Sequence, residues 1–191
     1  MSEILGLYMS PRRQGNSDLL LDEFLRGAAE SGVGINRIYT RDLDVEGCIE
    51  CGGCDETGEC IIQDDMDELY PLLINAKYVV AASSIFFYGL PAKAKAFVDR
   101  SQALWNRVRL NPQLARPDGR GFFIGVGATK GKNLFEGTLL TMKYFYDALG
   151  LPAKVEELTY RRVEGKGAVR DHPTALRDVF AAGVKFGKEI K

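Results

Sequence analysis

The fold is decided near the amino terminus by the stretch Ile4-Leu5-Gly6-Leu7-Tyr8-Met9-Ser10-Pro11-Arg12-Arg13-Gln14-Gly15-Asn16-Ser17. Its first five residues form a short apolar run that is typical of a buried strand. A polar loop follows and ends in Asn16-Ser17, residue types that favour a helix N-terminus. Apolar residues then recur at helical spacing, which predicts a helix from about residue 17 to residue 32.

The rest of the chain continues this alternation of strands and helices. Further strands are expected at 35–39, 77–83, 122–126 and 154–160, and further helices at 66–75, 91–105, 139–149 and 176–184, with a polar loop at 106–120. Such alternation implies parallel strands joined by right-handed crossovers. We therefore expect an α/β protein, a three-layer α/β/α sandwich around a five-stranded parallel sheet of order 2-1-3-4-5. We expect one domain over 1–191, with a cysteine-rich loop, 44–65, inserted after the second strand.

Length and composition narrow the class of protein. The chain has 191 residues, 46% of them hydrophobic, and a formal net charge of -1, so it lacks the basic excess of a nucleic-acid-binding protein. No apolar run approaches the roughly 18 residues that span a bilayer, and the first residues do not resemble a signal peptide. We expect a cytoplasmic protein with no nucleic acid or membrane partner.

The loop at 10–17 is a candidate phosphate site. It leads into a helix N-terminus, where free N–H groups and the helix dipole favour an anion, and Arg12 or Arg13 adds positive charge. In a sheet of order 2-1-3-4-5 it would flank the switch point between the first and third strands, where ligands bind. The alternative is a solvated turn with a capping Asn or Ser.

A second loop at the same edge of the sheet contains Ser84-Ile85-Phe86-Phe87-Tyr88-Gly89-Leu90. A loop that only makes a turn is usually polar, so these apolar and aromatic side chains suggest contact with a flat ring. Aromatic residues buried in an extended strand are the alternative. The turn from Gly127 to Gly131 could close the same pocket with backbone amides.

All four cysteines lie between Cys48 and Cys60, with the spacing C-x2-C-x2-C-x5-C and glycines among them. In a reducing compartment, thiols so closely grouped favour a metal centre over structural disulfides. Three interpretations stay open: an iron-sulfur cluster, zinc, and cysteines that are free or partly disulfide-linked. Zinc usually takes two well-separated C-x2-C pairs, which this compact loop lacks.

The motifs together resemble the NADPH-dependent FMN reductase superfamily. They are Ser10-x-Arg12-x-x-Gly15-Asn16-Ser17, the cysteine loop ending in Asp64-Asp65-Met66, and the segment from Ser84 through Pro91 to Lys95-x-Phe97-x-Asp99-Arg100. The cysteine insertion looks like that of the superfamily's iron-sulfur flavoprotein branch. The resemblance implies a flavodoxin-like fold that binds FMN.

The resemblance also implies site residues. Ser10, Arg12, Asn16 and Ser17 would hold the FMN phosphate, with Ser84, Ile85, Phe86, Phe87 and Gly89 against the isoalloxazine ring and Thr129 nearby. Cys48, Cys51, Cys54 and Cys60 would ligate a 4Fe-4S cluster. Family members often have Pro-[VI]-Tyr where this chain has Ser84-Ile85-Phe86, so backbone contacts to the flavin are expected here and a tyrosine hydroxyl is not.

The leading hypothesis is an FMN-dependent oxidoreductase that transfers electrons between a 4Fe-4S cluster and FMN, with NAD(P)H or a ferredoxin-like protein as redox partner. The alternatives are an NAD(P)H-dependent FMN or quinone reductase without a cluster, a non-enzymatic flavodoxin-like carrier, and a zinc-stabilised binding module without flavin. By analogy with the family we expect a homodimer or homotetramer. We expect no catalytic side chain, because the cofactor does the chemistry, and we expect His172, the one histidine, to cap a helix or lie on the surface.

Overall fold

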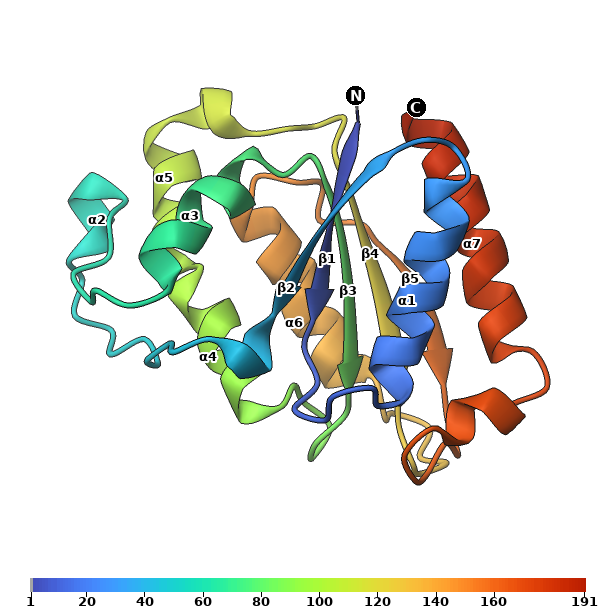
Figure 1. Ribbon diagram of the computed structural model, residues 1–191. Coiled ribbons are helices and arrows are strands. Elements are labelled where there is room, and N and C mark those ends of the chain that lie inside the picture. The colour runs from blue at the N-terminus through green and yellow to red at the C-terminus, as the bar shows by residue number, and fades with distance from the viewer. Residues whose placement is uncertain (1) are drawn as a thin grey trace.

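Five parallel strands form the centre of the molecule in the computed structural model, which describes residues 2–191 (Figure 1). They are β1 (Glu3–Tyr8), β2 (Gly34–Tyr39), β3 (Tyr78–Ser84), β4 (Arg120–Val126) and β5 (Val155–Tyr160). Their order is β2-β1-β3-β4-β5, and every neighbouring pair is parallel. The predicted fold class is confirmed.

Helices cover both faces of the sheet (Figure 1). The helices α1 (Asn16–Ala29) and α7 (Ala175–Ile190) lie on one face, and α3 (Met66–Asn75), α4 (Ala92–Arg100), α5 (Gln102–Leu110) and α6 (Glu136–Ala148) on the other. A short helix, α2 (Cys54–Thr57), lies beside α5, and 3-10 turns occupy Thr40–Asp42, Pro112–Leu114 and Ala168–Asp171. Within residues 2–191, no helix is both long enough and apolar enough to span a membrane.

The first strand explains why its sequence is an unbroken apolar run. Ile4 and Tyr8 pack into the core beneath α1 and α7, whereas Leu5 and Leu7 pack into the core beneath α3 to α6. Successive side chains of a strand point to opposite faces, so a strand covered on both sides needs apolar residues at every position.

The helices α1 and α7 approach each other closely because of glycine. A Cβ atom at Gly183 of α7 would lie 2.0 Å from the backbone carbonyl oxygen of Phe24 in α1. Any other residue there would push the two helices apart, since protein interiors leave no space for such an overlap.

The helix expected at 91–105 differs most from the structure, and the difference bears on function. The helix expected at 91–105 is two helices, α4 and α5, which meet at Ser101, and α5 continues to Leu110 through the segment expected to be a polar loop. The buried Ser101 hydroxyl donates to the carbonyl oxygen of Phe97 (3.2 Å), a bond that often bends helices. The polar residues at 106–109 lie on a face of α5 that contacts the cysteine loop, as described below.

Candidate cofactor site and cysteine pocket

A pocket of about 220 Å³ lies where β1, β3 and β4 end. The hydroxyl groups of Ser10 and Ser84 are 2.9 Å apart there and connect the loops that follow β1 and β3. The pocket is lined by Ser10, Pro11, Arg12, Gly15, Asn16, Ser17, Ser84, Ile85, Phe86, Val126, Gly127, Ala128, Val163, Glu164 and Gly165. The two loops that the sequence predicted to share a site therefore lie against each other.

The N-terminus of α1 points its first turn at this pocket. Gly15 occupies the N-cap position and no side chain of the described residues caps the helix, so the predicted capping by Asn16 or Ser17 is wrong. The Asn16 amide instead donates to the carbonyl oxygen of Gly165 (2.7 Å) and accepts from the N–H of Val169 (3.2 Å). The backbone N–H groups of the first turn of α1, including that of Asn16, have no partner within the helix and can bind a ligand.

The Ser17 hydroxyl is the buried polar group in this pocket that lacks a partner. It is buried, and within residues 2–191 it makes no hydrogen bond. A buried hydroxyl without a partner costs about 1–3 kcal/mol, so such a group is expected to meet a ligand or water. Both arginines of this loop are exposed, but Arg12 lines the pocket, whereas Arg13 does not and pairs with Asp42 at 2.6 Å. Of the two candidate arginines, Arg12 can reach an anion here.

A buried ion pair holds the loop at 10–17 in place, and sequence reasoning missed it. Asp18 and Arg41 are both largely buried and lie 3.0 Å apart, and Asp18 also accepts from the N–H of Gln14 (2.9 Å). Burial raises the pKa of Asp18, although Arg41 acts in the opposite direction. Arg41 also donates to the carbonyl oxygen of Ser10 (3.1 Å). No spacing rule connects residues this far apart in the sequence.

The aromatic segment after β3 forms a tight turn at the rim of the pocket. Phe86 and Gly89 exchange backbone hydrogen bonds of 3.0 and 2.9 Å, and Phe87 and Tyr88 between them have φ angles of 48° and 64°. Bulky residues are strained in this left-handed region. Phe86 lines the pocket, but the Phe87 side chain is fully exposed and points away from the protein.

The pocket gathers seven of the ten residues predicted for a flavin cofactor. Phe87, Gly89 and Thr129 are not among its lining residues. The segment 163–165, which follows β5, lines the pocket but was not predicted. Ligands of such sheets bind beyond the carboxyl ends of the strands, so this rule could have identified the segment, which follows the carboxyl end of β5. The helix N-terminus, the serine hydroxyls and the apolar Ile85 and Phe86 suit an anion joined to an apolar ring.

The four cysteines line a second pocket, of about 600 Å³, between the cysteine loop and the start of α5. None forms a disulfide; Cys48 and Cys51 are exposed, and Cys54 and Cys60 are partly buried against the core. Among residues 2–191, no three His, Cys, Asp or Glu side chains are arranged to hold one metal ion. Four thiols on one pocket nevertheless match, in type and number, the ligands of an iron-sulfur cluster.

Arg100 of α4 anchors one side of the cysteine loop. Its guanidinium group has no solvent exposure and donates to Asp64 (2.5 Å) and to the carbonyl oxygens of Glu46 (3.1 Å) and Ile62 (3.0 Å). Burial would raise the pKa of Asp64, but hydrogen bonds from Arg100 and from the N–H groups of Glu46 and Met66 outweigh it and lower that pKa. Both ends of the loop are thereby fixed to α4.

Two arginines of α5 anchor the other side. Arg107 donates to the carbonyl oxygen of Gly58 (2.7 Å), and Arg109 donates to the carbonyl oxygen of Asp55. These bonds explain why α5 extends past the predicted helix end, because its polar side chains contact the loop backbone. The cysteine loop is therefore held against α4 and α5.

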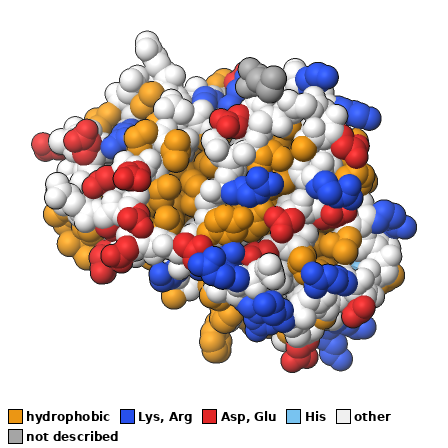
Figure 2. Space-filling model, in the orientation of Figure 1, with side chains coloured by type: hydrophobic (Ala, Val, Ile, Leu, Met, Phe, Trp, Pro, Cys, Tyr) orange, Lys and Arg blue, Asp and Glu red, His pale blue; other side chains and the backbone are white. Residues whose placement is uncertain are grey.

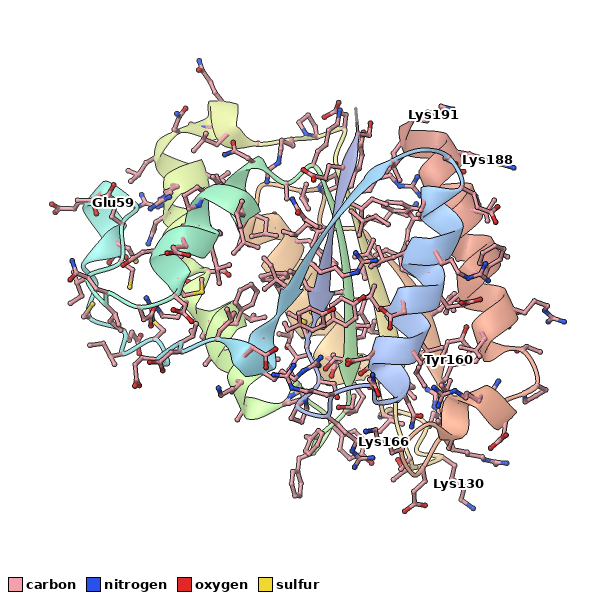
Figure 3. All side chains as sticks on the ribbon, viewed as in Figure 1. Glu59, Lys130, Tyr160, Lys166, Lys188 and Lys191 are labelled. Atoms are coloured by element: carbon pink, nitrogen blue, oxygen red, sulfur yellow. The ribbon has the colours of Figure 1, made fainter. Side chains whose placement is uncertain are left out.

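The two pockets lie apart. The cysteine loop follows β2, which is parallel to β1 and β3 and ends at the same edge of the sheet, but the two pockets share no lining residue. In Figure 3, Glu59 marks the end of the molecule that carries α2, whereas Lys130 and Lys166 mark the end to which the strands point. Figure 2 shows many acidic side chains on the α2 side, and residues 42–68 contain no Lys or Arg.

His172 has the structural role that the sequence predicted. Its Nδ1 accepts hydrogen bonds from the N–H groups of Thr174 (3.3 Å) and Ala175 (3.1 Å) at the start of α7. The imidazole caps this helix and does not line either pocket.

Comparison with known proteins identifies a matching family and relatives that are similar in sequence. The family model described as NADPH-dependent FMN reductase matches residues 2–132. A Methanocaldococcus jannaschii protein named iron-sulfur flavoprotein is 33% identical over 130 residues, which cover 68% of this chain and 65% of that protein. A Methanosarcina thermophila protein of the same name is 32% identical over 102 residues, 53% of each chain. The matches thus span between about half and two thirds of these relatives' length.

Solved structures share the fold at low sequence identity. An NAD(P)H:quinone oxidoreductase from Methanothermobacter marburgensis superposes with a TM-score of 0.74 at 17% identity, covering 97% of this chain and 96% of that one. An FMN-dependent NADH-azoreductase from Bacillus anthracis gives a TM-score of 0.67 at 13% identity, covering 97% and 100%. At these identities the likeness shows the fold alone.

Proposed function

The chain belongs to the NADPH-dependent FMN reductase family, in the branch of the relatives named iron-sulfur flavoproteins, and we propose that it is an FMN-dependent oxidoreductase that also carries a 4Fe-4S cluster. When bound, FMN supplies one- and two-electron exchange and the cluster supplies one-electron exchange. The protein itself binds, orients and electrostatically supports these groups. No acid or base of the chain is required for the chemistry.

The Ser17 hydroxyl is the observation that carries the FMN half of the proposal. It is a buried donor without a partner among the described residues, at a helix N-terminus that also lacks a side-chain cap. We propose that Ser10, Arg12, Ser17 and the backbone N–H of Asn16 bind the phosphate, because a doubly charged anion satisfies several donors at once. The Asn16 side chain positions the 163–169 loop through its two hydrogen bonds.

The planar ring of FMN would lie across the ends of β3 and β4. We propose that Ser84, Ile85, Phe86 and Gly89 contact it with backbone and apolar groups, with Thr129 nearby. Phe87 points into solvent, so its proposed contact with the ring requires the turn to move or the side chain to change rotamer.

The cluster half of the proposal rests on Cys48, Cys51, Cys54 and Cys60 as ligands. Each cysteine of a 4Fe-4S cluster binds its own iron, so the sulfurs surround a group larger than one ion. Zinc usually takes two well-separated C-x2-C pairs, whereas these four cysteines lie within one short loop. The shared pocket therefore supports a cluster better than zinc.

The electrostatics of the two ends suggest where redox partners bind. NAD(P)H is an anion, and the surface around the cysteines is acidic, so a nicotinamide donor would approach the FMN end. A ferredoxin-like protein remains the alternative donor. We further propose one domain over 1–191, a homodimer or homotetramer, and a cytoplasmic location, where the reduced state of four thiols is maintained.

Anaerobic purification followed by analysis of iron, sulfide and FMN tests both halves. We expect one FMN and one cluster per chain. Because the pockets share no residue, Cys54→Ala should lose iron and keep FMN, whereas Ser17→Ala should weaken FMN binding and keep iron. Stoichiometric flavin without iron in the unaltered protein would remove the cluster from the proposal.

A cluster-free NAD(P)H-dependent FMN or quinone reductase is the second candidate. Cys48 and Cys51 are exposed, and the cysteine pocket lies apart from the FMN pocket, so the flavin site does not depend on the cysteines. Steady-state reduction of a quinone by NADPH, at equal rates in iron-free and iron-containing protein, would favour this candidate.

A further inference from the structure

Asn106 of α5 reaches a cysteine sulfur from within the protein. Its side chain is buried, with 1% of its surface exposed, and its Nδ2 lies 3.2 Å from the Sγ of Cys54 and 3.1 Å from the Oδ1 of Asp55. The backbone N–H of Glu50 also contacts a sulfur, that of Cys48, but over 3.5 Å and at an exposed position. Asn106 is thus a buried donor to a cysteine sulfur.

The orientation of the Asn106 amide follows from its neighbours. Arg109 donates its Nε–H to the Oδ1 of Asn106 (3.2 Å), and a guanidinium group can only donate hydrogen bonds. The oxygen of the amide must therefore face Arg109, and the NH2 group must face Cys54 and the carboxylate of Asp55. The assignment of nitrogen and oxygen, which is often ambiguous in an amide, is settled here by the chemistry of the partners.

We propose that Asn106 is a positioning residue for Cys54 and that its N–H···S hydrogen bond raises the reduction potential of the cluster held by the four cysteines. This inference rests on the proposed function. A hydrogen-bond donor stabilises the more negatively charged state of the group that accepts it, and one-electron reduction adds a negative charge to the cluster and its sulfurs. Burial strengthens the effect, because water does not screen a donor inside the protein.

The test compares Asn106→Leu with Gln102→Leu in anaerobically purified protein. Gln102 lies one turn earlier on α5 and lines the cysteine pocket, but none of its described contacts is a hydrogen bond to a sulfur. Both proteins are titrated with dithionite in the presence of redox mediators while cluster and flavin absorbance are followed. Iron content, FMN content and the urea midpoint are measured on the same samples.

We expect N106L to favour the oxidised cluster about tenfold, a shift of the midpoint by about 59 mV to more negative potential for one electron. The FMN midpoint should not change, and Q102L should behave like the unaltered protein. Asn106→Asp, which has the same shape and still accepts from Arg109 but lacks the N–H donor, should shift the potential in the same direction. A loss of stability alone would not move the potential of an intact cluster.

An unchanged cluster midpoint in loaded N106L or N106D would overturn the inference and leave the proposed function intact. Loss of iron from both variants, with Q102L still loaded, would also overturn it, because Asn106 would then be needed to assemble the cluster and would not tune it. An unaltered protein that holds FMN and no iron or sulfide would overturn the cluster proposal itself.

Discussion

Replacement of Arg100 by leucine tests how the cysteine loop is held to the protein. The guanidinium group is fully buried, and it donates to both carboxylate oxygens of Asp64 (2.5 and 3.2 Å) and to the carbonyl oxygens of Glu46 and Ile62. Leucine keeps an apolar stem in the same space but removes all four of these hydrogen bonds. The loop would then lose its attachment to α4.

The expected cost follows from these contacts. Removing one partner of a buried ion pair typically costs about 3–5 kcal/mol, because the other charge is left without compensation. Asp64 keeps hydrogen bonds from the N–H groups of Glu46 (2.9 Å) and Met66 (3.0 Å), which reduces the penalty on the carboxylate. The two carbonyl oxygens each lose a bond worth about 1 kcal/mol. We expect R100L to lower the free energy of unfolding by about 3–5 kcal/mol.

Urea denaturation measures this change, followed by the fluorescence of Trp105, the single tryptophan, and by circular dichroism. Lys95→Ala is the matched control, because Lys95 pairs with Asp99 on the same helix while both side chains are 49% and 42% exposed. An exposed pair contributes about 0–1 kcal/mol, so K95A should change little. The double variant R100L/D64N should be more stable than R100L, since it leaves no unpaired carboxylate.

Two results would refute the reasoning. If R100L lies within about 1 kcal/mol of the unaltered protein, the buried pair does not anchor the loop. If R100L and R100L/D64N are equally unstable, the cost comes from the lost carbonyl contacts, and the unpaired charge contributes nothing.

Three further predictions concern the two pockets. Ser17→Ala should weaken FMN binding about tenfold or more with folding unchanged, because it removes a hydrogen bond to a charged group. Ser31→Ala, just beyond the carboxyl end of α1, should bind FMN normally. Flavin fluorescence titration measures both, and an equal Kd for the two variants would exclude Ser17 from the phosphate site. Phe87→Gly should raise the free energy of unfolding by about 1 kcal/mol, because glycine relieves the strain of a positive φ and the lost side chain is exposed. Phe86→Gly should lower the free energy of unfolding, and a loss of stability in F87G would show that the turn is not strained. Because the pKa of Asp64 is lowered in the folded state, its contribution to stability is present above about pH 4 and is lost as the pH falls through that lower pKa. The urea midpoint of D64N should therefore depend less on pH in this acid range than that of the unaltered protein. Identical slopes of midpoint against pH would contradict the assignment.

The sheet and most of its helices could be predicted because their signals are local. The unbroken apolar run at β1 and the β-branched centre of β3 indicate strands buried on both faces, and the glycine at 150, with a φ of 75°, ends α6 as expected. The alternation of strands and helices then implied parallel pairing through right-handed crossovers, for which a doubly wound sheet of order 2-1-3-4-5 is the simplest arrangement. The loops after β1 and β3 were expected to flank the switch point of this sheet, and the hydroxyl groups of Ser10 and Ser84 in these loops are 2.9 Å apart.

The errors have a common physical cause, which is that a side chain's partner can lie far away in the sequence. Residues 106–109 look like a polar loop until Arg107 is seen to bind the carbonyl oxygen of Gly58. Asn16 is a good helix cap by type, but its amide instead holds the loop at Gly165 and Val169. Local preference is weaker than the requirement that buried polar groups find partners.

The sequence by itself determined the fold class, the location of a polar loop that leads into the N-terminus of α1, and four thiols within one short segment. These depend on periodicity, residue type and spacing along the chain. Only the tertiary structure decided that the cysteine pocket lies against α4 and α5, apart from the pocket at the strand ends, and that Asn106 faces Cys54. The reason is that an inserted loop has no periodic pattern of its own, so its position is set by hydrogen bonds and ion pairs from distant helices, such as those of Arg100 and Arg107.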